Sequence, residues 1–402
     1  MFEIKGKINT AVCYASVVES AAVEQIRRMC NYEITAGSRI RIMPDVHAGK
    51  GCTVGTTMTV TDKVVPNIVG TDIGCGMYTV NIGQIRVDFA EIDRVARNGL
   101  SGTNAFGKKI KNFSYEGLRC YRELGDLSGM KQSLGTLGGG NHFIEIDEAA
   151  DGTRYLIVHS GSRSLGKQVA EYYQNLAIRL KNDSACNRAA GEKFSSPCTG
   201  KKSGQKNKGQ EAAVPPRDDK KTSGSAIPDD LCFLSGKYLD DYLHDVEICQ
   251  AFARLNREII AGVLLKTAGL TAYESFHTIH NYIDTREMIL RKGAIAAHSG
   301  ETVIIPINMR DGCVLAKGRG NSEWNYSAPH GAGRLLSRSE AKDTLDIDEY
   351  RESMKGIFTT SVNVSTLDES PMAYKSLHDI VDVIGDTVEI LDIMKPVFNF
   401  KA

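Results

Sequence analysis

The chain has 402 residues, of which 42% are hydrophobic and 24% are charged, as is usual for a globular protein with a sizeable core. Its 49 basic and 49 acidic residues balance, which argues against a protein that coats nucleic acid through many phosphate contacts. No stretch approaches about 20 apolar residues and the first residues form no apolar signal core, so we expect a cytoplasmic protein with no membrane span, whose ten cysteines are reduced.

Helical and strand-like patterns are interleaved along the sequence. Apolar residues at helical spacing predict a helix at 17–30, and alternation predicts strands at 39–43 and 52–60. The elements predicted after these are a strand at 155–158, helices at 166–181 and 239–263, strands within 276–316 and a C-terminal helix at 371–394. This interleaving favours the α+β class, with one mixed α/β unit over residues 1–402.

Residues 182–228 interrupt this pattern. The run from 201 to 225 is rich in Lys, Gly, Ser, Gln and Pro and has almost no apolar residues to anchor it, so we predict a flexible loop insertion. It is either a basic flap that touches RNA or a tolerated surface insertion. We favour the second interpretation, because loops accept insertions at little entropic cost.

Residues able to bind metal gather in glycine-rich, polar stretches. Five of the nine histidines lie in such stretches, and a sixth stretch, 70–76, contains an acid and a thiol three residues apart. A thiolate with imidazoles suits Zn, Fe, Co or Mn, and a carboxylate could bridge to a second ion. The candidate ligands are Asp72, Cys75, His142, His159 and His280.

Two of these candidates have alternatives. A lone cysteine is more often a small buried hydrophobic residue, although its glycine neighbours and Asp72 favour Cys75 as a ligand. His277 competes with His280: three residues apart on a strand, the two point to opposite faces, so only one can reach the site. We interpret His244, His298 and His378 as structural or surface residues.

Other polar residues could bind phosphate. The glycine-rich segment 135–141 could cradle an anion with its N–H groups, or could simply be a turn. Arg163 and Arg334 each follow a histidine by four residues, and each could grip phosphate oxygens or bind loop carbonyl groups. His330 could be a further metal ligand, or a nucleophile that accepts a phosphoryl or nucleotidyl group.

The ordered motifs of the chain resemble those of the RtcB family of RNA ligases. They are residues 43–51, 70–77, 138–145, 159–163, 280–281, 291–294 and 330–334. The resemblance implies a single RtcB-like catalytic domain. It also implies a reaction that joins an RNA 3′-phosphate or 2′,3′-cyclic phosphate to a 5′-hydroxyl, with GTP and Mn2+, in RNA repair or tRNA splicing.

The resemblance also implies a role for each site residue. Cys75, His159 and His280 would hold one of two manganese ions, while Asp72, Cys75 and His142 would hold the other. His330 would carry the covalent guanylate. The nucleotide pocket would comprise Asn141, Phe143, Glu145, Asn281, Asn308, Ala332, Gly333 and Lys401. The RNA phosphates would meet Arg163, Arg334 and Arg338.

One segment departs from the family pattern. Where the family has Pro-Gly-Ser-Met-Gly, this chain reads Pro306-Ile307-Asn308-Met309-Arg310. The departure suggests a divergent paralogue with altered nucleotide binding. It leaves two alternatives: a metal-dependent RNA 2′,3′-cyclic phosphodiesterase that does not seal ends, or a non-catalytic RNA-binding protein.

Overall fold

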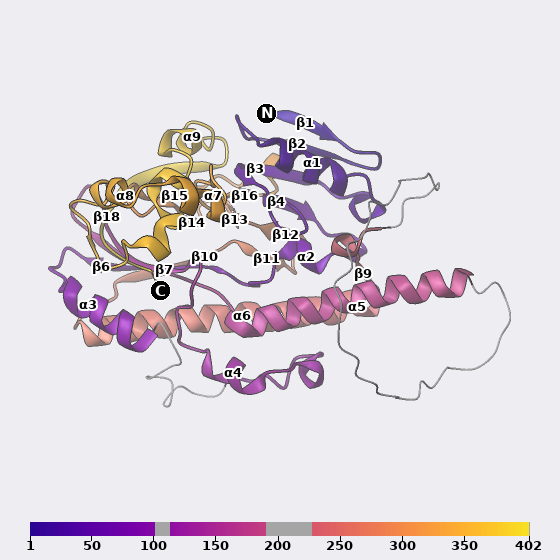
Figure 1. Ribbon diagram of the computed structural model, residues 1–402, viewed down its shortest axis with the longest axis horizontal. Helices are drawn as coiled ribbons and strands as arrows, with labels where there is room; N and C mark the ends of the chain where they lie inside the picture. The colour runs from indigo at the N-terminus through magenta and orange to yellow at the C-terminus, as the bar shows by residue number, and fades with distance from the viewer. Residues whose placement is uncertain (101–112, 190–226, 402) are drawn as a thin grey trace, which may run out of the picture.

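The computed structural model describes residues 1–100, 113–189 and 227–401, with only the backbone for 184–189. Figure 1 shows an α+β protein in which sheets are flanked along one side by two long helices. The first sheet has six strands. Their order across the sheet is β1 (Phe2–Lys5), β2 (Thr10–Cys13), β3 (Ile40–His47), β4 (Val54–Thr59), β12 (Ile289–Lys292) and β11 (Asn281–Asp284). Only the β2–β3 pair is parallel among these neighbours.

The second sheet has eight strands and contributes most of the candidate site. Its order is β10 (Glu274–Ile279), β6 (Gly76–Gly83), β8 (Arg154–Ser160), β7 (Phe143–Glu148), β18 (Val388–Lys401), β15 (Gly312–Gly318) and β14 (Thr302–Asn308), with β17 (Phe358–Thr359) parallel to β18. Two short pairs complete the strands: β13 (Ala294–Ala296) with β16 (Ser327–Pro329), and β5 (Lys63–Val64) with β9 (Leu234–Ser235).

The helices differ greatly in length. The shorter ones are α1 (Ser20–Met29), α2 (Pro66–Val69), α3 (Phe89–Val95), α4 (Leu127–Gln132), α7 (Arg338–Thr344), α8 (Ile347–Ser353) and α9 (Leu377–Val381). The two long ones, α5 (Arg163–Ala189) and α6 (Lys237–Thr267), run side by side along the sheets. No helix among the described residues is long and apolar enough to cross a membrane.

Most predicted elements are confirmed, because their apolar periodicity matches the burial. The helices at 17–30, 166–181 and 239–263 correspond to α1, α5 and α6, and the strands at 39–43, 52–60 and 155–158 to β3, β4 and β8. The predicted stripe of α6 is only partly the buried face. Leu239, Val246 and Phe252 are buried, whereas the fully buried Asn256 and Arg257 were not part of the stripe.

Two predicted boundaries are wrong. The C-terminal helix at 371–394 is limited to α9, and the chain then forms β18, the long strand between β7 and β15. The apolar residues of this segment have helical spacing, but the segment pairs with a strand on each side, β15 and β7. Sheet pairing therefore outweighs the local helical pattern. The insertion was predicted to begin at 182, but α5 continues to Ala189. Residues 182–190 contain no Gly or Pro that would end the helix earlier. The rest of the predicted loop, 190–226, lies outside the described residues.

Candidate metal and nucleotide site

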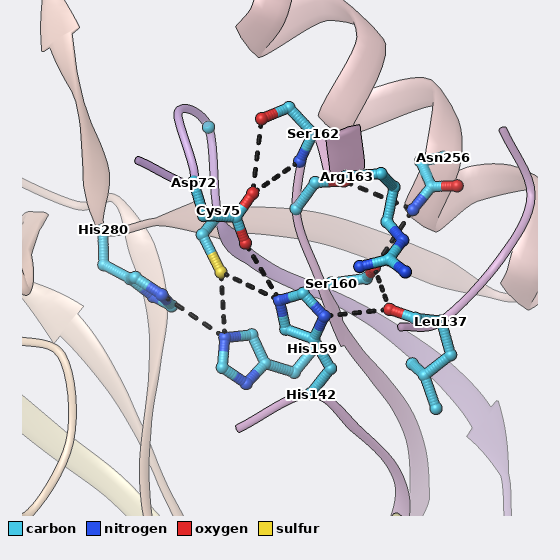
Figure 2. Close-up of polar contacts among 12 residues, drawn as sticks. Asp72, Cys75, Leu137, His142, His159, Ser160, Ser162, Arg163, Asn256 and His280 are labelled. Atoms are coloured by element: carbon cyan, nitrogen blue, oxygen red, sulfur yellow. Dashed lines mark hydrogen bonds and ion pairs between the residues drawn. The ribbon is translucent and has the colours of Figure 1, made fainter. Parts of the chain in front are cut away.

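The order of strands in the larger sheet brings the predicted metal ligands together. Strands β10, β6, β8 and β7 are consecutive neighbours and all antiparallel. His280 directly follows β10, Cys75 directly precedes β6, His159 lies near the end of β8, and His142 directly precedes β7. All four side chains therefore lie at the same end of these neighbouring strands. Figure 2 shows them clustered with Asp72.

The donor atoms of this cluster face one another. The Cys75 Sγ atom lies 3.5 Å from His142 Nε2 and 3.4 Å from His159 Nε2, and the Nε2 atoms of His159 and His280 are 3.3 Å apart. Tetrahedral ligands at about 2.3 Å (sulfur) and about 2.0–2.1 Å (nitrogen) lie about 3.5 Å apart, or about 3.3 Å for two nitrogens. The spacings fit donors around shared cations. Asp72 Oδ2, 3.0 Å from His142 Nε2, extends the set.

The electrostatics of the cluster also suit a cation. Burial, followed by the neighbouring histidines, lowers the pKa values of His159 and His280 well below the ordinary value, so both imidazoles are neutral, the form that binds metal. Burial and the Asp72 carboxylate raise the pKa of the Cys75 thiol. Burial alone would raise the pKa of Asp72, but His142, Cys75 and Ser162 lower it to about 2, which keeps a negative charge beside the thiol.

Helix α6 fixes the loops that carry these ligands. Asn256 Oδ1 accepts hydrogen bonds from the N–H groups of Gly135 and Thr136, and its Nδ2 donates to Thr136, Ser160 and Gly161. Arg257 donates to the carbonyl groups of Gly74 and Ser160, at 2.8 and 2.7 Å. Both residues are fully buried. Neither residue was predicted from the sequence. The available signal was their polar character within a helix whose other buried residues are mostly apolar.

Contacts behind the ligands set their orientation. The Leu137 carbonyl oxygen lies 2.9 Å from His142 Nδ1, so Nδ1–H donates and Nε2 is left to face the cluster. The Ser160 hydroxyl donates to the same carbonyl group, at 2.8 Å. Asp72 Oδ1 accepts from the Ser162 N–H at 2.9 Å, which turns its other oxygen toward His142.

A cavity of about 390 Å³ opens beside this cluster. Volumes of this order fit a nucleotide-sized ligand. Asp72, His159 and His280 form part of its wall, and so do all eight residues expected to bind nucleotide: Asn141, Phe143, Glu145, Asn281, Asn308, Ala332, Gly333 and Lys401. The structure thus gathers these residues around one space, which also contacts His330, Arg334 and Arg338.

His330 lines the cavity beside the cluster and has a fixed orientation. Its ring centroid is 4.9 Å from that of His280. The Asp45 Oδ2 atom lies 2.6 Å from His330 Nδ1 and 3.1 Å from its backbone nitrogen, and Asp45 is completely buried. Nδ1–H therefore donates to Asp45, and Nε2 keeps the free lone pair. Asp45 lies within the motif 43–51, but no role was predicted for it from the sequence.

The glycine three residues after His330 is required for a steric reason. Gly333 has φ +77°, and a Cβ there would lie 2.4 Å from the Asp45 carbonyl oxygen. Any larger residue would push the segment that carries His330 away from the strand that carries Asp45.

Buried charges line the far end of the cavity. Lys401 is buried, its ammonium group donates to Glu369 Oε2, and it lies 5.9 Å from the centre of the Phe143 ring. Asn399 Nδ2 donates to Glu145 Oε2 at 2.5 Å. Glu369, at the end of the 3-10 helix η7 (Val364–Glu369), was not found from the sequence.

The three arginines expected to meet RNA have different surroundings. Arg163 lies beside the glycine-rich loop: its Nε is 3.3 Å from Thr136 Oγ1, and a Cβ on Gly138 would clash with its guanidinium group. Arg334 donates to the carbonyl groups of Leu336 and Asp368, as the structural interpretation anticipated. Arg338 is half-exposed and pairs with Asp368 and Glu369. Their contact with RNA stays a prediction.

The atypical segment after Pro306 lies at the end of β14. Ile307 is buried in a hydrophobic cluster. Asn308 Oδ1 accepts from the N–H groups of Arg310 and Asp311, and its Nδ2 donates to Asp311 Oδ2 at 2.8 Å. The Asn308 side chain therefore stabilises the β14–β15 turn while also lining the cavity.

The structure resolves the choice between His277 and His280. His277 points away from the cluster, stacks on Tyr78 and lies 3.1 Å from Glu258 Oε1 on α6. His47 lies beside the cavity, with Nδ1 2.9 Å from the Asp45 carbonyl oxygen, and burial lowers its pKa to about 4.

The fold and this site define a class: a mixed α+β protein with a candidate transition-metal centre that opens into a nucleotide-sized cavity. The family model described as tRNA-splicing ligase RtcB matches residues 25–111 and 124–402, so the chain belongs to the RtcB family.

Named relatives agree with this membership. The chain is 27% identical to the RNA-splicing ligase RtcB of Escherichia coli (strain K12), over 90% of each chain. It is 27% identical to RNA-splicing ligase RtcB2 of another Escherichia coli strain, over 96% of this chain and 93% of the relative. It is 26% identical to the tRNA-splicing ligase RtcB of Aeropyrum pernix, over 85% and 83%.

Proposed function

We propose that this protein is an RNA ligase that joins an RNA 3′-phosphate or 2′,3′-cyclic phosphate end to a 5′-hydroxyl end, with GTP and two manganese ions. The observation that carries the proposal is the environment of His330. Asp45 holds its Nδ1, the ring lies beside His280, and Nε2 is left free on a residue that lines the cavity next to the cluster. This is the arrangement expected of an oriented imidazole nucleophile.

The donor set supports manganese at the cluster. Cys75, His159 and His280 would hold one ion, and Asp72, Cys75 and His142 would hold the other, with Cys75 belonging to both donor sets. Mixed sulfur, imidazole and carboxylate ligands suit such a cation. Bound there, manganese would neutralise charge on phosphate oxygens.

The polar groups of the cavity support GTP. On one edge of the base, guanine has a carbonyl oxygen that accepts a hydrogen bond and two nitrogens that donate hydrogen bonds. A carboxylate at Glu145 and an ammonium at Lys401 complement that edge, and β18 pairs with β7 so that Lys401 lies opposite Phe143, next to the Glu145–Asn399 pair. Asn141, Asn281 and the Ala332–Gly333 backbone would meet the rest of the nucleotide.

The proposed reaction begins on His330. Its Nε2 attacks the α-phosphorus of GTP, a P–N bond forms, and pyrophosphate leaves. The oxygen of an RNA 3′-phosphate then takes the GMP group, which breaks the P–N bond. Finally, the 5′-hydroxyl oxygen attacks the activated 3′-phosphate and GMP leaves. Asp45 would stabilise the charge on the imidazole in the two steps that form and break the P–N bond. Arg163, Arg334 and Arg338 would hold the RNA phosphates.

Covalent labelling tests the proposal. Purified protein is incubated with α-labelled GTP and Mn2+, run on a denaturing gel, and then mixed with broken RNA. We expect an acid-labile, alkali-stable labelled band that discharges as joined RNA appears. His330→Ala should abolish the band, while His298→Ala, which changes a partly exposed histidine paired with Glu287, should keep it. A His330→Ala protein that still forms the band would refute the nucleophile.

A second candidate is a phosphodiesterase that opens cyclic phosphates without sealing. It is favoured by the atypical segment, where the Asn308 amide is engaged by the turn and Ile307 fills the core. The same assay separates the two: opened but unjoined ends, with no labelled protein for any nucleotide, would favour the phosphodiesterase. Label from a nucleotide other than GTP would show changed base selection instead.

A further inference from the structure

A second group of metal-binding residues lies in the larger sheet, away from Cys75. Glu145 and Asp147 share one face of β7, and Cys313 lies on β15, on the other side of β18. One ligand atom from each lies within 4.8 Å of the others, and all three side chains are buried. Glu145 lines the cavity, whereas Asp147 and Cys313 lie behind it.

Several oxygens of this group have no partner. Both carboxylate oxygens of Asp147, which is fully buried, have no hydrogen-bond partner among the described residues, and neither does Oδ1 of Asn399, which is 1% exposed. Asn399 is held against the group, because its Nδ2 donates to Glu145. An unpaired buried carboxylate is costly unless a cation or a proton compensates it.

No protein cation contacts these carboxylates in the described chain. Two ammonium groups act on these carboxylates through electrostatics without a hydrogen bond: that of Lys401, which donates to Glu369, and that of Lys395, which is exposed. A shared proton is the alternative to a cation. Burial and then the Glu145 carboxylate raise the pKa of Asp147 well above its ordinary value, so a protonated Asp147 could donate to Glu145. That proton would engage a single oxygen of Asp147 and would leave Asn399 Oδ1 without a partner, whereas a cation could bind all of these oxygens.

We propose that Glu145, Asp147 and Cys313 bind a divalent cation of the zinc class, separate from the Cys75 centre, with Asn399 Oδ1 as a further neutral donor. The Cys313 Sγ atom lies 3.6 Å from Glu145 Oε1. A sulfur at about 2.3 Å and an oxygen at about 2.0–2.2 Å around a tetrahedral ion are about 3.5–3.7 Å apart, so this spacing fits. Binding would release the thiol proton of Cys313 and any proton held by the carboxyl groups.

The ion would stabilise the wall of the cavity. Glu145 and Asn399 both face the cavity, so a cation behind them would fix the positions of two groups that a nucleobase meets. This metal site would form whatever the cavity binds, because its donor atoms and unpaired oxygens do not depend on the ligase reaction.

Cobalt substitution of the full-length protein tests the site. Co2+ bound to a thiolate gives a charge-transfer absorption band in the near ultraviolet. In a Cys75→Ala protein, Cys313 would be the thiolate at a metal site, so we expect the band to persist there and to vanish in Cys75→Ala/Cys313→Ser. Cys13→Ser in the same background, which changes a buried cysteine of β2, should keep the band. A folded Cys75→Ala protein without the band would overturn the proposal.

A second variant guards against misfolding of the first. Asp147→Asn preserves the shape of the side chain and leaves both cysteines in place. After dialysis against zinc and removal of loosely bound metal, we expect it to hold one equivalent less zinc than the wild type, measured by elemental analysis. Equal zinc content in the two proteins would also contradict the site and favour a carboxyl pair that shares protons.

Discussion

Replacing Asp45 by Asn tests whether the orientation of His330 matters. Asp45 Oδ2 accepts two hydrogen bonds from His330, at 2.6 Å from Nδ1 and 3.1 Å from the backbone nitrogen, while Oδ1 has no hydrogen-bond partner among the described residues. An amide has nearly the same shape, so the fold should survive. It lacks the negative charge that favours Nδ1–H and that would stabilise the imidazole as it accepts a nucleotidyl group.

The size of the effect follows from the bond that is lost. A hydrogen bond to a charged group contributes about 1.5–3 kcal/mol, which is about 10- to 150-fold in rate. An Asp-to-Asn change behind a catalytic histidine of a serine protease costs about 10⁴-fold, because the wrong tautomer forms. We therefore expect Asp45→Asn to slow formation of the covalent nucleotide adduct by about 10²- to 10⁴-fold.

Single-turnover labelling by rapid quench measures this rate directly. GTP concentration is varied, so that the maximal rate and the half-saturating concentration are obtained separately. The reasoning predicts that the maximal rate falls while half-saturation changes little, because Asp45 does not line the cavity. A maximal rate within threefold of the wild type, in a protein of unchanged thermal stability, would refute it.

Other changes probe the rest of the site. Cys75→Ala should lose manganese and ligation together, measured by elemental analysis and RNA joining; full activity would disprove the bridging role. Lys401→Met removes an ammonium group from the part of the cavity wall where we propose that the guanine base binds, and it should raise the half-saturating GTP concentration by about 10-fold or more, with a smaller effect on the maximal rate. Arg257→Leu removes the side-chain donor that the carbonyl groups of Gly74 and Ser160 share; it should lower the midpoint of thermal unfolding and weaken manganese binding. Removal of metal by a chelator should stop labelling, and added Mn2+ should restore it.

The candidate metal ligands could be predicted from the sequence because their local context is distinctive. Imidazoles and a thiol beside glycines mark places where strands end, and the structure confirms that Cys75, His142, His159 and His280 meet at one sheet edge. Choosing His280 over His277 needed the resemblance or the structure. The parity of a strand separates the two residues but does not say which face holds the ions.

The missed residues share a different property. Asp45, Asn256, Arg257 and Glu369 act through partners that are distant in the chain, such as His330, 285 residues from Asp45. Local pattern carries no information about such pairs. The C-terminal segment was mistaken for a helix for the same reason. Residues 388–401 form a strand because β7 and β15 lie on either side of them, and sheet pairing overrides local periodicity.

Locating the covalent nucleotide tests the central claim most directly. The protein labelled with GTP and Mn2+ is digested at alkaline pH, and the modified peptide is identified by mass spectrometry. The account predicts a GMP group on His330, lost when RNA with 3′-phosphate and 5′-hydroxyl ends is added before digestion, in step with the appearance of joined RNA. A GMP group on another residue, or joined RNA formed with no adduct in either the wild type or His330→Ala, would contradict it.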